Sequence, residues 1–349
     1  NLLRAFDTSL GADDGVAVSY MLYLLDSDIT NIECLFTVQE EIGLVGANYF
    51  DYTLLHWKYL INLDNESDKD LIIGCAGGIN LVYSKDLEYK DNNYQAYKLS
   101  LSNLSGGHSG VDIGLKKQNA NLLLANLLLH LNETDNIYLN SFNGGTKDNV
   151  ICYESVVTFS YNNKDIENKI NEYFKTINFI KEDQNYQWNL EKIDKQKALS
   201  NERTIKILNL ITNLKQNVIT YDNELNMVKT SANIGVIKTE NNILNLTLSL
   251  RSNDNIEKEK YIKINDEIAH KYEFKIEHIR EYPGWDYNKD NKLISIYEKE
   301  YSKVFKNKLN LMTIHAGLEC GIIYKKTGIK NMISVGPNIY DVHSIREHL

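Results

Sequence analysis

The chain has 349 residues and a hydrophobic content of 43%, which together indicate a globular protein of about two domains. Its formal net charge of −9 argues against nucleic acid as a partner. The longest apolar run, residues 122–131, is too short to cross a bilayer, so we expect no membrane span. The four cysteines show neither disulfide nor metal-binding spacing, which is typical of a reducing compartment, and we expect a cytoplasmic protein.

The first predicted element is a helix over residues 16–25, where the apolar content suits a buried helix. Asp13 and Asp14 stand directly before it. One aspartate is enough to cap a helix N-terminus, so capping leaves the second carboxylate unexplained.

Residues 32–39 form an apolar, β-prone run that predicts a buried strand, and Glu40 and Glu41 follow it directly. Two carboxylates cannot both lie near an apolar core without partners. A metal ion could hold one of them, and the other could then act as a base. A Glu-Glu pair on its own is more often a solvated turn, so this interpretation depends on the other strand ends of the chain.

Three further predicted strands lead toward acidic or histidine side chains, and they cover residues 59–63, 309–314 and 332–335. Because the carboxyl ends of strands in an open α/β sheet converge on one crevice, we expect Asp13, Glu41, Asp64 and His343 to meet there. Carboxylate and imidazole ligands without thiolate suit zinc, manganese or cobalt. Three carboxylates and one histidine exceed the usual set for a single catalytic zinc, and a carboxylate shared by two metals would account for the excess.

The middle of the chain alternates strands and helices with meander-like pairing, which indicates an inserted α+β domain. The predicted strands there cover residues 96–104, 137–143, 150–160, 231–238, 244–250 and 274–278, and the predicted helices cover residues 119–131, 164–176, 201–214 and 257–272. The turn Pro283-Gly284 marks the point at which the chain returns from the inserted domain to the first domain. We predict an α/β protein in which residues 1–77 and 283–349 form one domain with a mostly parallel sheet. Residues 78–282 form the inserted domain, joined to it by two hinge strands.

Eight motifs occur in order over nearly the whole chain: LGADDG at 10–15, TVQEEIG at 37–43, INLD at 61–64, GCAGG at 74–78, GGHSG at 106–110, NGGT at 143–146, YPGW at 282–285 and HAGLECG at 315–321. Any one of them is weak, but the ordered set resembles the aminoacyl-histidine dipeptidase family of two-zinc metallopeptidases. That family is also called the cytosol non-specific or β-alanyl-histidine dipeptidases. The resemblance implies a zinc-peptidase catalytic domain with an inserted lid, small peptide substrates and a homodimer.

The resemblance also implies roles for the residues at the strand ends. Asp13 would bridge two zinc ions, which manganese or cobalt could replace. Asp64 would complete one metal site, while Glu41 and His343 would complete the other. Glu40 would act as the general base on a metal-bridged water during dipeptide hydrolysis.

In the lid, the resemblance places His108 at the scissile carbonyl oxygen, and Arg251 and Asn149 near the substrate carboxylate. Both residues also have a purely structural interpretation: His108 could be a loop residue among glycines, and Arg251 could be a surface charge at a strand end. His315 and Glu319 lie one helical turn apart beside the expected site, so we interpret them as substrate-pocket residues.

Two features of the family pattern are missing from this sequence. No His-x-Asp pair precedes Asp13, and the family continues into a closing helix beyond the position of His343. We expect the complete protein to be longer; the other interpretation is a chain with one incomplete zinc site. Two alternative functions stay open: an N-acyl amino acid deacylase of the same architecture, and an inactive, metal-poor homologue that acts as a binding protein. The resemblance further implies a cis peptide bond between Asp13 and Asp14.

Overall fold

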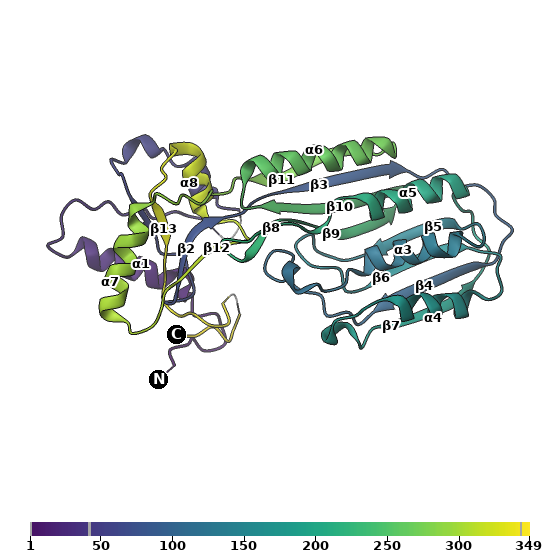
Figure 1. Cartoon of the computed structure of the whole chain (residues 1–349), viewed down its shortest axis with the longest axis horizontal. Coiled ribbons are helices and arrows are strands. Elements are labelled where there is room, and N and C mark those ends of the chain that lie inside the picture. Colours follow the sequence, from purple (N-terminus) through teal and green to yellow (C-terminus); the bar gives the residue numbers. More distant parts are fainter. Residues whose placement is uncertain (1, 41–42, 343) are drawn as a thin grey trace. The chain divides into compact units, whose positions relative to one another are not determined.

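The computed structural model describes residues 2–40, 43–342 and 344–349, and Figure 1 shows its elements in chain order. The chain divides into two compact units. Unit 1 comprises Asn1–Gly77, Asn253–Asn255 and Tyr282–Leu349, and unit 2 comprises Gly78–Ser252 and Ile256–Glu281. The chain therefore passes between the units four times, and not twice as the sequence predicts.

Unit 1 is built on a four-stranded sheet with the order β1-β13-β2-β12. Its strands are β1 (Leu60–Asn62), β2 (Asp70–Cys75), β12 (Asn310–Ile314) and β13 (Met332–Ser334). The pairs β1–β13 and β12–β2 are parallel, whereas β13 and β2 are antiparallel. The sheet is thus mostly parallel, as predicted. The described helices of this unit are α1 (Ala12–Leu25), α2 (Val45–Tyr49), α7 (Lys292–Val304) and α8 (Glu319–Thr327).

Trp285 is the largest fully buried side chain of unit 1, and it packs with Ile72 and Cys75 of β2. The backbones of Trp285 and Cys75 exchange two hydrogen bonds, each 3.0 Å long. The neighbouring backbones come so close that a Cβ atom on Gly284 would lie 2.6 Å from the Gly77 nitrogen. Glycine is therefore required where the YPGW turn meets the end of β2.

Asn253–Asn255 belongs to unit 1 because its side-chain amides bond to that unit. Nδ2 of Asn253 donates to Thr313 Oγ1 at 2.9 Å and to the Ile314 carbonyl at 3.1 Å. Nδ2 of Asn255 donates to Asp286 Oδ1 at 2.9 Å. These contacts join residues about 30 to 60 positions apart, which a local sequence pattern cannot reveal.

Two predictions for the first fifty residues need correction. Residues 32–39 do not form a strand, since the described part of the chain has no strand hydrogen-bonded to them, and Gln39 has a φ of 57°. The predicted helix exists as α1, but it is not buried: only Ala12 and Ala17 are buried, while Tyr23 is 75% exposed. The cis peptide bond between Asp13 and Asp14 is confirmed.

Unit 2 contains a large sheet with the order β11-β3-β10-β9-β5-β6-β4-β7, to which β8 is added through its pairing with β9. Its strands are β3 (Gly77–Asp86), β4 (Ala96–Ser102), β5 (Tyr138–Gly144), β6 (Ser155–Ser160), β7 (Gln187–Ile193), β8 (Asn217–Asp222), β9 (Met227–Glu240), β10 (Ile243–Ser252) and β11 (Lys275–Tyr282). Each pair with a resolved register is antiparallel. The sequence did not predict β3, β7 and β8 as strands.

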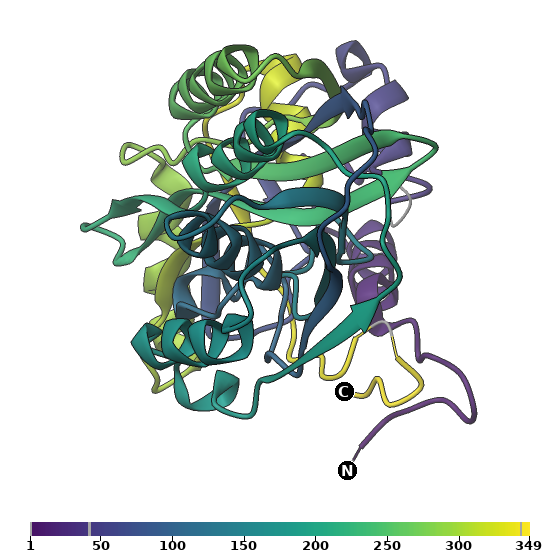
Figure 2. The same ribbon diagram turned by 90° about the vertical axis from the view of Figure 1, so that its right-hand side faces the viewer.

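Four helices cover one face of this sheet (Figures 1 and 2): α3 (Ala120–Asn132), α4 (Ile166–Thr176), α5 (Asn201–Asn213) and α6 (Asn255–Lys271). In α4, Ile166, Ile170 and Phe174 recur every four residues and are buried, so a single apolar stripe faces the sheet. The N-cap of α3 is Asn119, whose side chain accepts from the N–H groups of Asn121 and Leu122. Among the described helices of both units, none has the length and apolar character needed to span a membrane.

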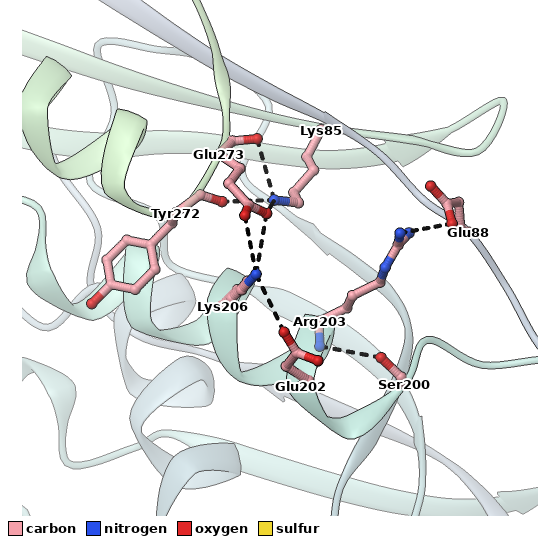
Figure 3. Close-up of polar contacts among 8 residues, drawn as sticks. All are labelled: Lys85, Glu88, Ser200, Glu202, Arg203, Lys206, Tyr272 and Glu273. Carbon is pink, nitrogen blue, oxygen red and sulfur yellow. Dashed lines mark hydrogen bonds and ion pairs between the residues drawn. The ribbon is translucent and has the colours of Figure 1, made fainter.

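An ion network ties α5, β3 and the end of α6 together in unit 2 (Figure 3). Lys85 Nζ donates to the carbonyl groups of Tyr272 at 2.6 Å and Glu273 at 3.2 Å. Lys206 Nζ lies 3.2 Å from the Glu273 carboxylate. The Lys85 side chain is only 12% exposed, so solvent screens its charge weakly. That charge caps the carboxyl-terminal end of α6.

Candidate active site

The Gly11–Asp14 turn of unit 1 is held by a residue from the other end of the chain. Gly11 has φ of 69°, and the peptide bond between Asp13 and Asp14 is cis. The carboxylate of Glu347 accepts from the N–H groups of Gly11 at 3.0 Å, Ala12 at 2.8 Å and Asp13 at 3.2 Å. This buried carboxylate therefore fixes the backbone that carries the two predicted site aspartates.

Asp64 lies just beyond β1, where polar groups fix its backbone. Its N–H donates to Asn62 Oδ1 at 3.2 Å, and its carbonyl accepts from Ser334 Oγ at 3.3 Å. Burial, then the negative charges of Glu40 and Asp13, raise the pKa of the Asp64 carboxyl to about 8. Asp64 therefore lies within electrostatic range of two acids that are distant from it in sequence.

Asp14 and Glu319 extend this acidic cluster of unit 1. Burial and the charge of Asp13 raise the pKa of Asp14 to about 7, with further contributions from Glu319 and Glu40. Glu319 accepts a hydrogen bond from Thr37 Oγ1 at 3.0 Å through Oε2. Its Oε1 is buried and has no hydrogen-bond partner among the described residues, and burial raises its pKa. The acidic cluster thus consists of Asp13, Asp14, Glu40, Asp64 and Glu319.

A cation fits the chemistry of this acidic cluster. Buried carboxylates that raise one another's pKa are destabilised as anions, and a bound divalent cation would relieve that repulsion. The described residues contain no group of three His, Cys, Asp or Glu side chains arranged as a complete metal site. The predicted ligands Glu41 and His343 lie outside the described residues, so two of the four predicted ligands, Asp13 and Asp64, are placed here.

His315 is buried in unit 1 beyond β12 and is oriented by Asn253. Its Nδ1 lies 2.6 Å from Asn253 Oδ1. The amide nitrogen of Asn253 donates to Thr313 and Ile314, so its oxygen faces the ring and Nδ1 carries the hydrogen. The sequence singled out His315 but not its partner, because Asn253 approaches from a distant part of the chain.

In unit 2, backbone groups set the tautomer of His108. Its Nδ1 accepts hydrogen bonds from the N–H groups of Gly110 at 3.3 Å and Val111 at 3.2 Å. The ring hydrogen of the neutral form therefore lies on Nε2, which becomes a donor. Burial, and then the positive charge of Arg251, lower the pKa of His108, while Asp112 opposes that shift. The ring is thus held as a neutral Nε2–H donor.

Arg251 and Asn149 occupy the same unit. Arg251 is the penultimate residue of β10 and is only 8% exposed, and its Nε is buried without a hydrogen-bond partner among the described residues. The interpretation of Arg251 as a surface charge is therefore wrong. The carbonyl of Asn149 accepts from the Ser109 N–H at 2.8 Å, which fixes the backbone next to His108.

Comparison with known proteins places the chain in a family. The cytosol non-specific dipeptidase of Escherichia coli strain K12 is 31% identical over 363 aligned positions, which cover 99% of this chain and 74% of that protein. The chain belongs to the cytosol non-specific dipeptidase family. Members of this family are metal-dependent peptide hydrolases, and this chain is a peptide hydrolase.

Solved structures agree with membership of the cytosol non-specific dipeptidase family. The aminoacylhistidine dipeptidase of Vibrio alginolyticus superposes with a TM-score of 0.91 at 29% identity, over 99% of this chain and 73% of that chain. A tripeptidase from Staphylococcus aureus shares the fold, with a TM-score of 0.52 at 16% identity, over 100% of this chain and 71% of that one. A model described as the peptidase dimerisation domain matches residues 99–183, inside unit 2. The predicted family and the α/β fold with an inserted domain are confirmed.

Proposed function

We propose that this chain is a zinc-dependent dipeptidase that hydrolyses Xaa-His and other dipeptides in the cytoplasm. The observation that carries this proposal is the acidic cluster of unit 1, in which burial, and then the charges of neighbouring carboxylates, raise the pKa values of Asp64 and Asp14. Such a cluster suits a divalent cation and has no evident use without one. Dipeptides are the substrate class because the E. coli relative is a non-specific dipeptidase.

The residues that would hold two zinc ions, or manganese or cobalt, are Asp13, Glu41, Asp64 and His343. When bound, the metal would polarise the scissile carbonyl and acidify a water molecule. Glu40 takes the proton of the attacking water and passes it to the leaving amine. Two observations support this role for Glu40: it lies within electrostatic range of Asp64, and its backbone is fixed by hydrogen bonds from Gly43 and Leu44 to its carbonyl.

Unit 2 contributes the groups that recognise the substrate and stabilise the transition state. The Nε2–H of His108 donates to the oxyanion that develops on the carbonyl oxygen. Arg251 pairs with the free carboxylate of the dipeptide. This role would account for a buried guanidinium whose Nε has no hydrogen-bond partner among the described residues. Asn149 supports this pairing, and His315 and Glu319 line the substrate pocket of unit 1. The match to a dimerisation domain supports a homodimer.

A comparison of three substrates tests this proposal. The purified protein is supplied with zinc and assayed with alanyl-histidine, N-acetylhistidine and alanyl-histidinamide. We expect hydrolysis of the dipeptide, little hydrolysis of the N-acetyl compound and a large loss for the amide, which lacks the carboxylate that Arg251 would pair with. Preference for N-acetylhistidine would indicate a deacylase. Zinc binding without hydrolysis of any of the three would indicate a binding protein.

A further inference from the structure

The loop that carries His108 is closed at its base by one carboxylate. Oδ1 of Asp183 accepts from both the N–H and the hydroxyl of Ser105, each at 2.7 Å. Oδ2 of the same residue accepts from the N–H of Gln118 at 2.8 Å. Ser105 and Gln118 are the two ends of the segment 105–118, which we call the His108 loop. A single side chain thus holds both ends of the His108 loop together.

Asp183 is suited to this task because it is itself firmly placed. Its side chain has no exposed surface, and it ends the short 3-10 helix Lys181–Asp183. Its N–H donates to the Ile180 carbonyl at 3.0 Å, and its carbonyl accepts from the Tyr186 N–H at 3.2 Å. The ring of Tyr186 stacks on that of Phe179 with the centroids 4.2 Å apart. Burial and these contacts therefore fix the position of Asp183.

The contacts continue from the base of the His108 loop to the imidazole. His108 donates its N–H to Asp112 Oδ2 at 2.9 Å, and its carbonyl accepts from the Asp112 N–H at 2.9 Å. The Gly107 carbonyl accepts from the Ile151 N–H at 2.9 Å. These bonds fold the loop so that the Gly110 and Val111 N–H groups reach Nδ1 of the ring. The tautomer of His108 thus depends on the shape of the whole loop.

We infer that Asp183 is a positioning residue for His108: it clamps the ends of the His108 loop and so keeps the imidazole in the orientation and tautomer that turnover needs. This inference rests on the proposed role of His108 as the oxyanion donor. Asp183 itself touches no reacting atom. A carboxylate is required because it offers two acceptor oxygens, one for each end of the loop, whereas an amide offers only one.

The first test is a double-mutant cycle on turnover of alanyl-histidine by the full chain loaded with zinc. In the otherwise unchanged protein, we expect Asp183→Asn to lower kcat by about 10-fold to 100-fold, with a much smaller effect on KM, because a displaced transition-state donor costs rate more than binding. In the His108→Ala background, Asp183→Asn should have almost no further effect on kcat. Equal losses in both backgrounds would overturn the inference, since Asp183 would then not act through His108.

Milder variants keep the test valid if Asp183→Asn folds poorly. Ser105→Ala removes only the hydrogen bond from the Ser105 hydroxyl to Asp183, at an exposed residue. It should lower kcat by a few-fold in the otherwise unchanged protein and have almost no effect in the His108→Ala background. Asp183→Glu restores two acceptor oxygens and should recover part of the lost rate. Asp266→Asn is the matched control, since its carboxylate accepts from Tyr83 and contacts His278, and neither residue belongs to the His108 loop. We expect the control to keep its kcat.

The second test does not depend on catalysis. Nitrogen NMR of protein labelled at histidine reports the tautomer of each ring, and the His108→Ala spectrum assigns the signal of His108. We expect Asp183→Asn to move the His108 signals away from the pure Nε2–H pattern while the other histidine signals stay in place. Unchanged His108 signals would overturn the inference even if turnover fell. If His108→Ala kept full turnover while Asp183→Asn moved the signals, the proposed catalytic role would fail and the clamp would stand.

Discussion

Oε1 of Glu347 accepts a hydrogen bond from the backbone N–H of Asp13 at 3.2 Å, although the two residues are 334 positions apart in the sequence. The same carboxylate accepts from Ala12 and Gly11, so three consecutive N–H groups converge on it. A residue that is distant in the sequence therefore helps to fix the turn that carries the predicted bridging aspartate. Two measurable properties, metal affinity and stability, should depend on this contact.

Glu347→Gln should weaken zinc binding by about 10-fold, because a group that orients a metal ligand typically matters to that extent. It should also lower the free energy of unfolding by about 1–3 kcal/mol, since the single amide oxygen cannot satisfy three backbone donors, of which the Ala12 N–H is buried. Zinc titration calorimetry on metal-free protein and thermal denaturation measure the two effects. Glu277→Gln, at an exposed glutamate of β11, is the control. A Glu347 variant that matches the control in both measurements would refute the prediction.

The pH dependence of His108 follows from its surroundings. Burial and the charge of Arg251 disfavour the imidazolium form, so the pKa of His108 lies below the ordinary value of 6.5. The neutral donor therefore prevails above that pH, and only acidification should remove its contribution to kcat. An NMR titration should place the midpoint of His108 below 6.5, and Arg251→Met should raise it. A midpoint above 6.5 in the unchanged protein would contradict this account.

Lys85→Met should destabilise unit 2 by about 1–2 kcal/mol, because it removes a largely buried cation from the carboxyl-terminal end of α6 (Figure 3). Chemical denaturation followed by circular dichroism measures the change. Lys303→Met is a suitable comparison, since Lys303 pairs with Glu300 at a solvent-exposed position of α7. Similar stability of the two variants would show that the Lys85 contacts contribute little.

Local sequence patterns predicted the elements that bury one face on a sheet. The predicted strands at residues 309–314 and 332–335 agree with β12 and β13 to within one residue at each end, because apolar runs and turn residues define them locally. Residues 32–39 have the same kind of pattern but no strand beside them in the described chain, so propensity alone did not make a strand. The contacts of Glu347, Asp183 and Asn253 could not be predicted, since each joins segments that only the tertiary fold brings together.

The central claim is that Asp13, Glu41, Asp64 and His343 hold zinc while Glu40 moves the proton. It is tested by measuring zinc content and alanyl-histidine turnover on the same samples. We expect the unchanged protein to lose activity on chelation and regain it with zinc. Glu40→Gln should retain its zinc while losing turnover by about 10²–10⁴-fold, whereas Glu41→Gln should lose zinc. Equal zinc content and equal turnover in the two variants, or full activity of the chelated protein, would contradict the account.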